Sequence, residues 1–264
     1  MIKTVIGLAS KFRDDIFVGA RFKNKLGQWA TVVSFKGYRD VQIKWEDEHG
    51  YVGTTSSVQL REGSFKNPYA PFVRGVGYLG VGEHQPTVNG VRTREYEAWT
   101  GMLTRCYCEE YLVEYPTYQN HKVATIWYNF QNFATWYKEK SKQVPDGEVW
   151  HLDKDILSGV DSSPEVCVLV PPRLNMLLVK NDVRRGSTLI GVSYEAERNK
   201  YRARCHNGTR KSQHLGWRTT EQEAFNLYKD FKEKLVKELA EEYKGKIDDR
   251  AYDALKSFTV NTTD

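Results

Sequence analysis

The chain has 264 residues, a formal net charge of +5 and 40% hydrophobic residues. Aromatic residues make up 13% and charged residues 28%, a balance that excludes a disordered chain and supplies enough apolar material for real cores. No apolar run approaches 18 residues and the four cysteines form no C-x-x-C pair. We therefore expect no membrane span, no disulfide scaffold and no ordinary zinc site, and we predict a cytoplasmic protein.

Residues 16–66 have the pattern of short β-strands. In the stretch "VQIKW", Val41, Ile43 and Trp45 alternate with Gln42 and Lys44, and turn-forming residues flank the run. Several closely spaced strands of this length predict a small SH3-like or Tudor-like β-barrel over residues 1–74. Such barrels bind peptides, nucleic acids or nothing, so the pattern leaves the partner of this domain open.

A glycine-dense stretch, residues 75–82, follows as a connector. Its match to a nucleotide-binding loop is weak, because no helix pattern follows and no Lys-Ser or Lys-Thr closes it. Between Tyr96 and Tyr137 apolar residues recur at helical spacing, which predicts two helices with aromatic core stripes. The sequence between them, "EEYLVEYPTYQN", is expected to be a loop.

The next stretch, "WHLDKDILSGVDSSPEVCVLVPPRLNMLL", predicts a β-hairpin that leads into a helix. We expect a first strand at residues 151–157, a turn at 159–164 and a second strand at 166–170. Pro171 and Pro172 then open a helix that carries Asn175.

The C-terminal third contains a concentrated positive charge. Residues 184–218 hold nine Arg or Lys against two acids, a net charge of +7 that exceeds that of the whole chain. Within this window the strand pattern places Lys200, Arg202 and Arg204 on one face and the intervening apolar residues on the other. A local excess of this kind is typical of a nucleic-acid-binding surface, with a solvated basic face as the simpler alternative.

An amphipathic helix is predicted after the basic window. Thr220 is a plausible N-cap, and Glu223 three residues later completes a capping box. We expect the helix to cover the apolar face of the basic strand through a stripe made of Phe225, Tyr228, Phe231, Leu235, Leu239 and Tyr243.

The segment from Leu189 to Lys234 resembles the DNA-binding domain of the plant ethylene-response-factor class, which also occurs in phage homing endonucleases. The matching residues are Gly191-Val192, Lys200 to Arg204, His214-Leu215-Gly216, Thr219 to Glu221 and Glu223-Ala224-Phe225. In that family a three-stranded sheet lies in the DNA major groove. The resemblance implies a DNA-binding domain over residues 184–247, double-stranded DNA as the partner, and contacts from Arg198, Lys200, Arg202, Arg204, Arg210 and Lys211.

The preceding segment, residues 75–183, resembles the HNH endonucleases of tailed phages. The matching residues are Trp99, Met102, Arg105, Cys106, Trp127, Phe130, Phe133, Trp136, Leu152 to Leu157, Ser163, Pro164, Cys167, Val170, Pro171 and Asn175. The resemblance implies an HNH-like ββα-metal fold with flanking helices, and phosphodiester hydrolysis with Mg²⁺ or Mn²⁺ as cofactor. If the chain is phage-encoded, its place is the cytoplasm of the host cell.

The candidate catalytic residues are His151, Asp153, Asp155 and Asn175. Alternation along a strand places the first three on one face, where Asp153 and Asp155 would be the metal ligands beside one imidazole. Asn175 on the helix would be a further ligand or a phosphate contact. A structural alternative is that the two aspartates are turn or cap carboxylates, or pair with Arg92, Arg94 or Arg173.

The chain departs from the HNH pattern at two positions. In the HNH pattern a metal-binding Asp is normally followed by the His that acts as general base. Lys154 occupies the position of that His, and Val166 stands where many members have Asn. Three readings stay open: a homing endonuclease, a non-cleaving DNA-binding protein that regulates or antagonises a host system, and a protein whose basic strand meets an acidic protein partner.

The expected fold class is therefore α+β. It consists of the N-terminal barrel, the central ββα region, a three-stranded sheet packed on a long helix, and a polar C-terminal tail at residues 248–264.

Overall fold

The computed structural model describes residues 15–178, 188–208 and 212–262, so the predicted DNA contacts Arg210 and Lys211 lie outside the described residues. The chain forms two compact units, one made of residues up to 72 with 76–82 and the other of residues 73–75 with 83–264. Both helices and sheets are present, as the α+β prediction requires. None of the helices in the described ranges has the length and apolar character that a membrane span needs.

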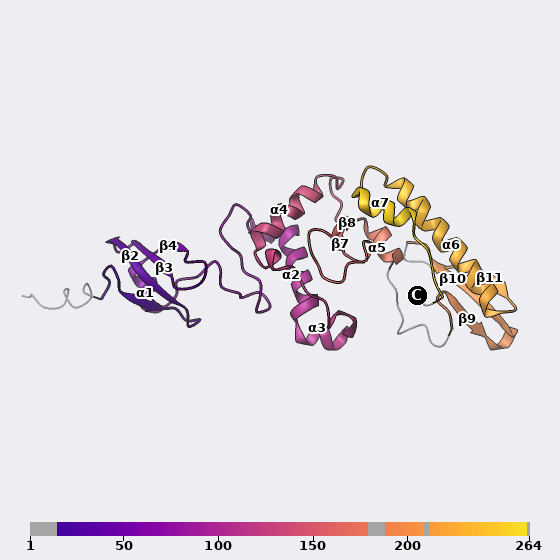
Figure 1. The fold of residues 1–264 in the computed structure, drawn as a ribbon, viewed down its shortest axis with the longest axis horizontal. Helices are drawn as coiled ribbons and strands as arrows, with labels where there is room; N and C mark the ends of the chain where they lie inside the picture. Colours follow the sequence, from indigo (N-terminus) through magenta and orange to yellow (C-terminus); the bar gives the residue numbers. More distant parts are fainter. Residues whose placement is uncertain (1–14, 179–187, 209–211, 263–264) are drawn as a thin grey trace, which may run out of the picture. The chain divides into compact units, whose positions relative to one another are not determined.

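The N-terminal unit is an open antiparallel sheet with one short helix (Figure 1). Its elements are β1 (Arg21–Lys23), β2 (Trp29–Gly37), β3 (Asp40–Trp45), β4 (Val52–Thr55) and α1 (Ser57–Glu62). The strand order is β1-β2-β3-β4, and no sheet in the described part of the chain closes into a barrel. The predicted barrel is wrong in this respect, because β1 and β4 do not pair with each other.

The alternation seen in the sequence does position the core of this unit. Val41, Ile43 and Trp45 of β3 are all buried, and they pack with Leu60 of α1 and with Phe65. Helix α1 begins at a capping box formed by Ser56 and Gln59, which satisfies backbone N–H groups at its first turn.

The second unit begins with a small hairpin and a group of helices. In chain order these are β5 (Thr87–Val88), β6 (Val91–Arg92), α2 (Arg94–Tyr107), α3 (Glu109–Glu114) and α4 (Phe130–Ser141). Trp99 and Phe130 lie in the predicted aromatic core, with ring centroids 5.3 Å apart. The segment expected to be a loop is partly helical, because α3 and a 3-10 turn at Pro116–Tyr118 lie inside it.

The predicted hairpin and helix are present, with shorter strands than expected. Strand β7 (His151–Asp153) pairs antiparallel with β8 (Val168–Val170), and α5 (Pro172–Leu178) follows. The first strand ends at Asp153 rather than residue 157, because the Asp153 carboxylate accepts the N–H of Ile156 at 2.9 Å and turns the chain.

The C-terminal part is a three-stranded sheet covered by one long helix (Figure 1). Its elements are β9 (Val192–Glu195), β10 (Lys200–His206), β11 (Ser212–Arg218), α6 (Glu221–Glu242) and α7 (Asp249–Lys256). The strand order is β11-β10-β9. The stretch expected to be a polar tail thus contains a helix, whose Ala251 and Leu255 are buried.

Helix α6 covers the apolar side of this sheet, as predicted. Ala203 and Cys205 of β10 share a buried cluster with Ala224, Phe225 and Tyr228 of α6. Gly191 is required for this contact, because a Cβ at that position would lie 2.1 Å from the Tyr228 ring.

The C-terminal half of α6 faces a second set of partners. Its buried positions include Lys232 and Val236, which the sequence stripe omitted. Lys232 is 6% exposed, and its ammonium donates to the carbonyl of Leu177 at the end of α5. Burial lowers the pKa of this amine. Arg173 of α5 also pairs with Glu242 at 3.1 Å, so α6 connects the three-stranded sheet to the hairpin–helix region.

The start of α6 gives a stability prediction. The Thr220 hydroxyl accepts the Glu223 N–H and the Glu223 carboxylate accepts the Thr220 N–H, so both halves of the capping box form. Thr220→Ala should therefore lower the free energy of unfolding by about 1 kcal/mol. Urea denaturation followed by circular dichroism measures this change. The exposed Thr117 provides the control, since Thr117→Ala should change stability by less than about 0.5 kcal/mol. Equal effects of the two substitutions would contradict the assigned cap.

Candidate nucleic-acid interface

The side of the three-stranded sheet that faces away from α6 is its cationic face. Lys200 and Arg204 of β10 are exposed, whereas Ala203 between them is fully buried on the α6 side. Arg202 pairs in register with Ser193 of β9 and with Trp217 of β11. Because directly paired residues share a face, these side chains lie on the same surface as Lys200 and Arg204. The predicted two-faced strand is confirmed. We call this surface the outer face; it consists of Ser193, Glu195, Lys200, Arg202, Arg204, His214 and Trp217.

Trp217 is the centre of the outer face. The guanidinium carbons of Arg198 and Arg202 lie 5.1 and 5.6 Å from its ring centroid. Glu195 of β9 pairs with Arg202 at 2.8 Å. The indole contacts both arginines, and the carboxylate holds Arg202. Because these side chains are already restrained, they lose less conformational entropy when they bind a partner.

An irregularity in β11 brings a second ring to this surface. Ala203 pairs with Gly216, but Arg204 pairs with His214, so Leu215 is an extra residue in the ladder. Leu215 packs against the buried cluster under the sheet. His214 therefore returns to the outer face, with its ring 5.3 Å from that of Trp217.

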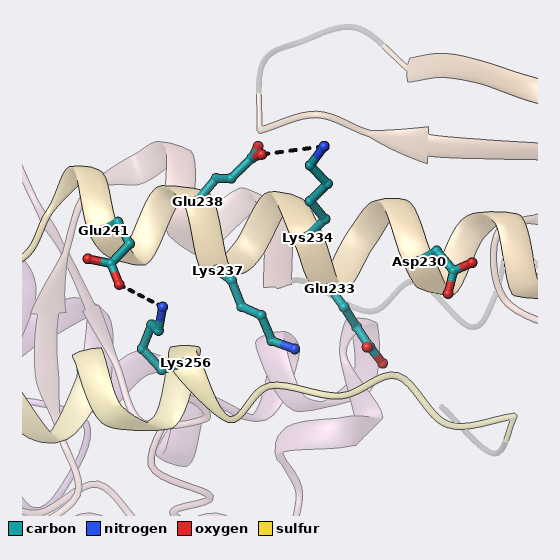
Figure 2. A pocket seen from close by; sticks show the side chains of 7 residues that line it. All are labelled: Asp230, Glu233, Lys234, Lys237, Glu238, Glu241 and Lys256. Carbon is teal, nitrogen blue, oxygen red and sulfur yellow. Dashed lines mark hydrogen bonds and ion pairs between the residues drawn. The ribbon is translucent and has the colours of Figure 1, made fainter.

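The outer face is mainly cationic, whereas the exposed side of α6 between residues 230 and 241 carries charges of both signs. Beside α6 lies a hollow of about 480 Å³. Figure 2 shows the acidic and basic side chains that line it. Lys234 pairs there with Glu238 at 3.8 Å, and Lys256 pairs with Glu241 at 2.6 Å. An internally neutralised surface of this kind offers a polyanion little attraction. On the outer face, by contrast, Lys200 and Arg204 form no ion pair within the described part of the chain.

Sequence reasoning found the cations of this face but missed two residues that arrange them. These are Glu195, one of the two acids in the basic window, and Trp217. Their roles depend on the strand register, in which Arg202 lies opposite Trp217 and Lys200 opposite Glu195. A hairpin between β10 and β11 could be predicted from the sequence. Its register could not, because the bulge at Leu215 shifts the pairing by one residue.

The second predicted site, in the hairpin and α5, is assembled only in part. His151 at the start of β7 and Asn175 of α5 are in contact, and the Asn175 side-chain amide donates to His151 Nδ1 at 3.0 Å. Asp153 lies two residues along the strand and is 9% exposed. Its burial, the largest influence, raises the pKa of the carboxyl, and nearby Asp155 raises it further.

The predicted metal ligands are not gathered around a common point. Asp153 accepts the Ile156 N–H as a turn carboxylate, and Asp155 pairs with Lys154 at 2.6 Å rather than with an arginine. Among residues 15–178, 188–208 and 212–262, no group of three His, Cys, Asp or Glu side chains is arranged to hold a metal ion. In this arrangement the residues do not fit Mg²⁺ or Mn²⁺, and we derive no step through a metal.

The two departures from the HNH pattern have structural roles here. Lys154 donates to the Asp155 carboxylate and, at 3.3 Å, to the carbonyl of Gly159, so it holds the loop after β7. Val166 packs over Gly159, where a Cβ would come within 2.7 Å of its side chain. Both residues therefore close the loop of the hairpin.

The buried Asp153 gives a prediction about pH. Because its pKa in the folded protein is raised, the ionised carboxylate reduces stability at neutral pH, and this cost disappears as the pH falls below the ordinary carboxyl pKa. Asp153→Asn keeps an oxygen for the Ile156 N–H and removes the charge. The variant should be more stable than the wild type at pH 7, and the difference should shrink as the pH falls. Urea denaturation at a series of pH values tests this.

The exposed Asp155 is the matched control. Asp155→Asn removes the charge of an exposed carboxylate but keeps an oxygen for its partner Lys154, whose side chain is only 12% exposed, so this variant should not be more stable than the wild type at pH 7. A destabilised Asp153→Asn protein at pH 7 would show that the carboxylate is held in its charged form.

Comparison of the chain with protein-family models, with curated proteins and with solved structures found no match. The function is therefore inferred from the geometry of these two sites.

Proposed function

We propose that the protein binds double-stranded DNA through the outer face of β9–β11. The observation that carries this proposal is the Trp217 cluster, in which Arg198 and Arg202 are held against one indole on an otherwise cationic sheet. The resemblance to the ethylene-response-factor class points to the same surface.

The shape and charge of the face suit duplex DNA. The major groove is about 12 Å wide and admits a helix or a β-ribbon, and the side chains of a sheet that enters it can reach base edges. Exposed Lys200 and Arg204 would neutralise phosphates and release counterions. Arg202, fixed between Glu195 and Trp217, is suited to base contact, since a bidentate arginine–guanine pair is worth about 1–3 kcal/mol of discrimination.

Salt dependence tests this assignment. Each phosphate contact contributes about 0.9 to the slope of log K against log salt. The double variant Arg202→Ala/Arg204→Ala should therefore lose about 0.9 from that slope, through Arg204, and bind more weakly through the loss of both side chains. Fluorescence anisotropy with labelled duplexes over a range of salt concentrations measures both quantities.

The matched control removes the same charge from the hollow of Figure 2. Lys234→Ala/Lys237→Ala should leave the slope close to that of the wild type, because these lysines line a mixed-charge surface. Equal slopes for all three proteins would exclude the outer face as the DNA contact. They would favour the reading in which the basic strand meets an acidic protein.

A second candidate function is phosphodiester hydrolysis at the hairpin and α5. The observation in its favour is the contact of His151 with Asn175 beside the buried, raised-pKa carboxyl of Asp153. These are the residues that the resemblance to phage HNH endonucleases selects. We propose that this region is HNH-like in ancestry, and whether it cleaves distinguishes an endonuclease from a non-cleaving regulator or antagonist.

Plasmid nicking separates these two possibilities. The wild type is incubated with supercoiled plasmid in Mg²⁺, Mn²⁺ or EDTA, with His151→Ala and Asp153→Asn alongside. An endonuclease should nick the plasmid, and both substitutions should reduce nicking by at least tenfold, as expected for loss of acid–base catalysis. The EDTA arm shows whether the nicking requires a metal ion. Retarded but intact plasmid under every condition would assign the hairpin and α5 to the non-cleaving alternative.

A further inference from the structure

The sheet of the N-terminal unit also has a cationic face. Arg21 of β1 pairs in register with Thr31, Thr31 with Lys44, and Lys44 with Val52, so one row of side chains crosses all four strands. The adjacent row, from Phe22 through Ala30 to Trp45, is on the core side. Because neighbouring rows point to opposite sides of a sheet, the row of Arg21 and Lys44 faces away from the core.

An exposed indole lies within this face. Trp29 pairs in register with Lys23 and is 42% exposed. The Arg21 guanidinium carbon lies 4.9 Å from its ring centroid, and the Lys23 ammonium lies 5.7 Å from it. Arg21 is also held by Glu46, with Nε donating to the carboxylate at 2.8 Å. We call the surface of Arg21, Lys23, Trp29 and Lys44 the N-terminal cationic face.

This arrangement repeats the chemistry of the Trp217 cluster. Each cluster has one indole, two cations within 6 Å of its ring, and one glutamate that pairs with one of the cations. The two sheets differ in strand number and strand order, so the likeness lies in the side chains and not in the fold. In both clusters the aromatic and acidic partners hold a guanidinium on the surface, where it needs little reorganisation to meet an anion.

We propose that the N-terminal cationic face binds the phosphate backbone of duplex DNA outside the segment contacted by β9–β11. Charge complementarity identifies the occupant. Glu46 neutralises Arg21, but Lys23 and Lys44 have no acidic partner among the residues that the structure describes. The acidic loop after β3 confines the contact to the strands. Asp47 and Glu48 are exposed and line one hollow with Lys44, and both carboxylates would repel a phosphate.

The consequence is a protein with two DNA contacts on two separate compact units. Once β9–β11 has bound, the N-terminal unit is confined near the same duplex, and its weak contact acts at a raised effective concentration. The N-terminal unit would then add affinity and footprint length without adding sequence specificity, because phosphate contacts carry no base information. This inference rests on the proposed DNA binding by the outer face.

The test uses the full-length chain with duplexes of about two and about six helical turns, roughly 20 and 60 bp. The face variant is Lys23→Gln/Lys44→Gln. The charge-matched control is Arg39→Gln/Lys66→Gln, which alters exposed cations away from the face. Arg39 lies in the turn between β2 and β3, at the other end of β2 from Trp29, and Lys66 follows the core residue Phe65. The salt slope of binding is measured for each protein on each duplex.

On the long duplex the face variant should lose roughly 1.8 from the slope, two contacts at about 0.9 each, whereas the control should match the wild type. The short duplex leaves little backbone outside a β9–β11 site, so there the face variant should lose less slope than on the long duplex. A face variant that matches the control on the long duplex would overturn the proposal and leave the face to a protein partner. An equal loss on both duplexes would overturn it as well. If the Arg202→Ala/Arg204→Ala variant binds the short duplex as strongly as the wild type does, the proposed function itself is rejected.

Discussion

The packing of α6 against β9–β11 is the contact on which both parts of the C-terminal region depend. A three-stranded sheet is stable only when a hydrophobic face packs against a partner such as a helix, so one of its surfaces must be covered. Ala203 and Cys205 pack against Ala224 and Phe225 across this contact. Arg204, which lies between the first two in β10, is exposed. The cationic outer face thus exists because α6 covers the opposite one.

The same helix fixes the sheet relative to the hairpin and α5. Lys232 caps the carbonyl end of α5 from within the buried stripe of α6, and Arg173 pairs with Glu242, the last residue of α6. Gly208, just after β10, lies so close to α5 that a Cβ there would be 2.9 Å from the side chain of Arg173. A buried amine is costly unless its proton donors are used. Its presence in this stripe indicates that the position of α5 relative to α6 is closely specified.

Features set by neighbouring residues were predictable from the sequence. The alternation of Val41, Ile43 and Trp45, the Thr220–Glu223 capping box and the two faces of β10 each depend on a few adjacent positions. Features set by distant contacts were not. Val236 and Lys232 are buried because α5 lies against that side of α6, which no local pattern records. The surroundings of the two predicted metal ligands also lie outside any local pattern: Asp153 accepts the Ile156 N–H, and Asp155 pairs with Lys154.

The extra residue Leu215 makes the outer face depend on chain length as well as on residue type. In a regular strand, His214 and Trp217 are an odd number of residues apart and would point to opposite sides of the sheet. The bulge cancels that offset, so both rings share one surface while Leu215 anchors the strand to the helix beneath. If the same residues paired without the bulge, the composition of β11 would be unchanged, yet His214 would point toward α6 and away from Trp217. The bulge therefore determines the make-up of the outer face as much as the arginines do.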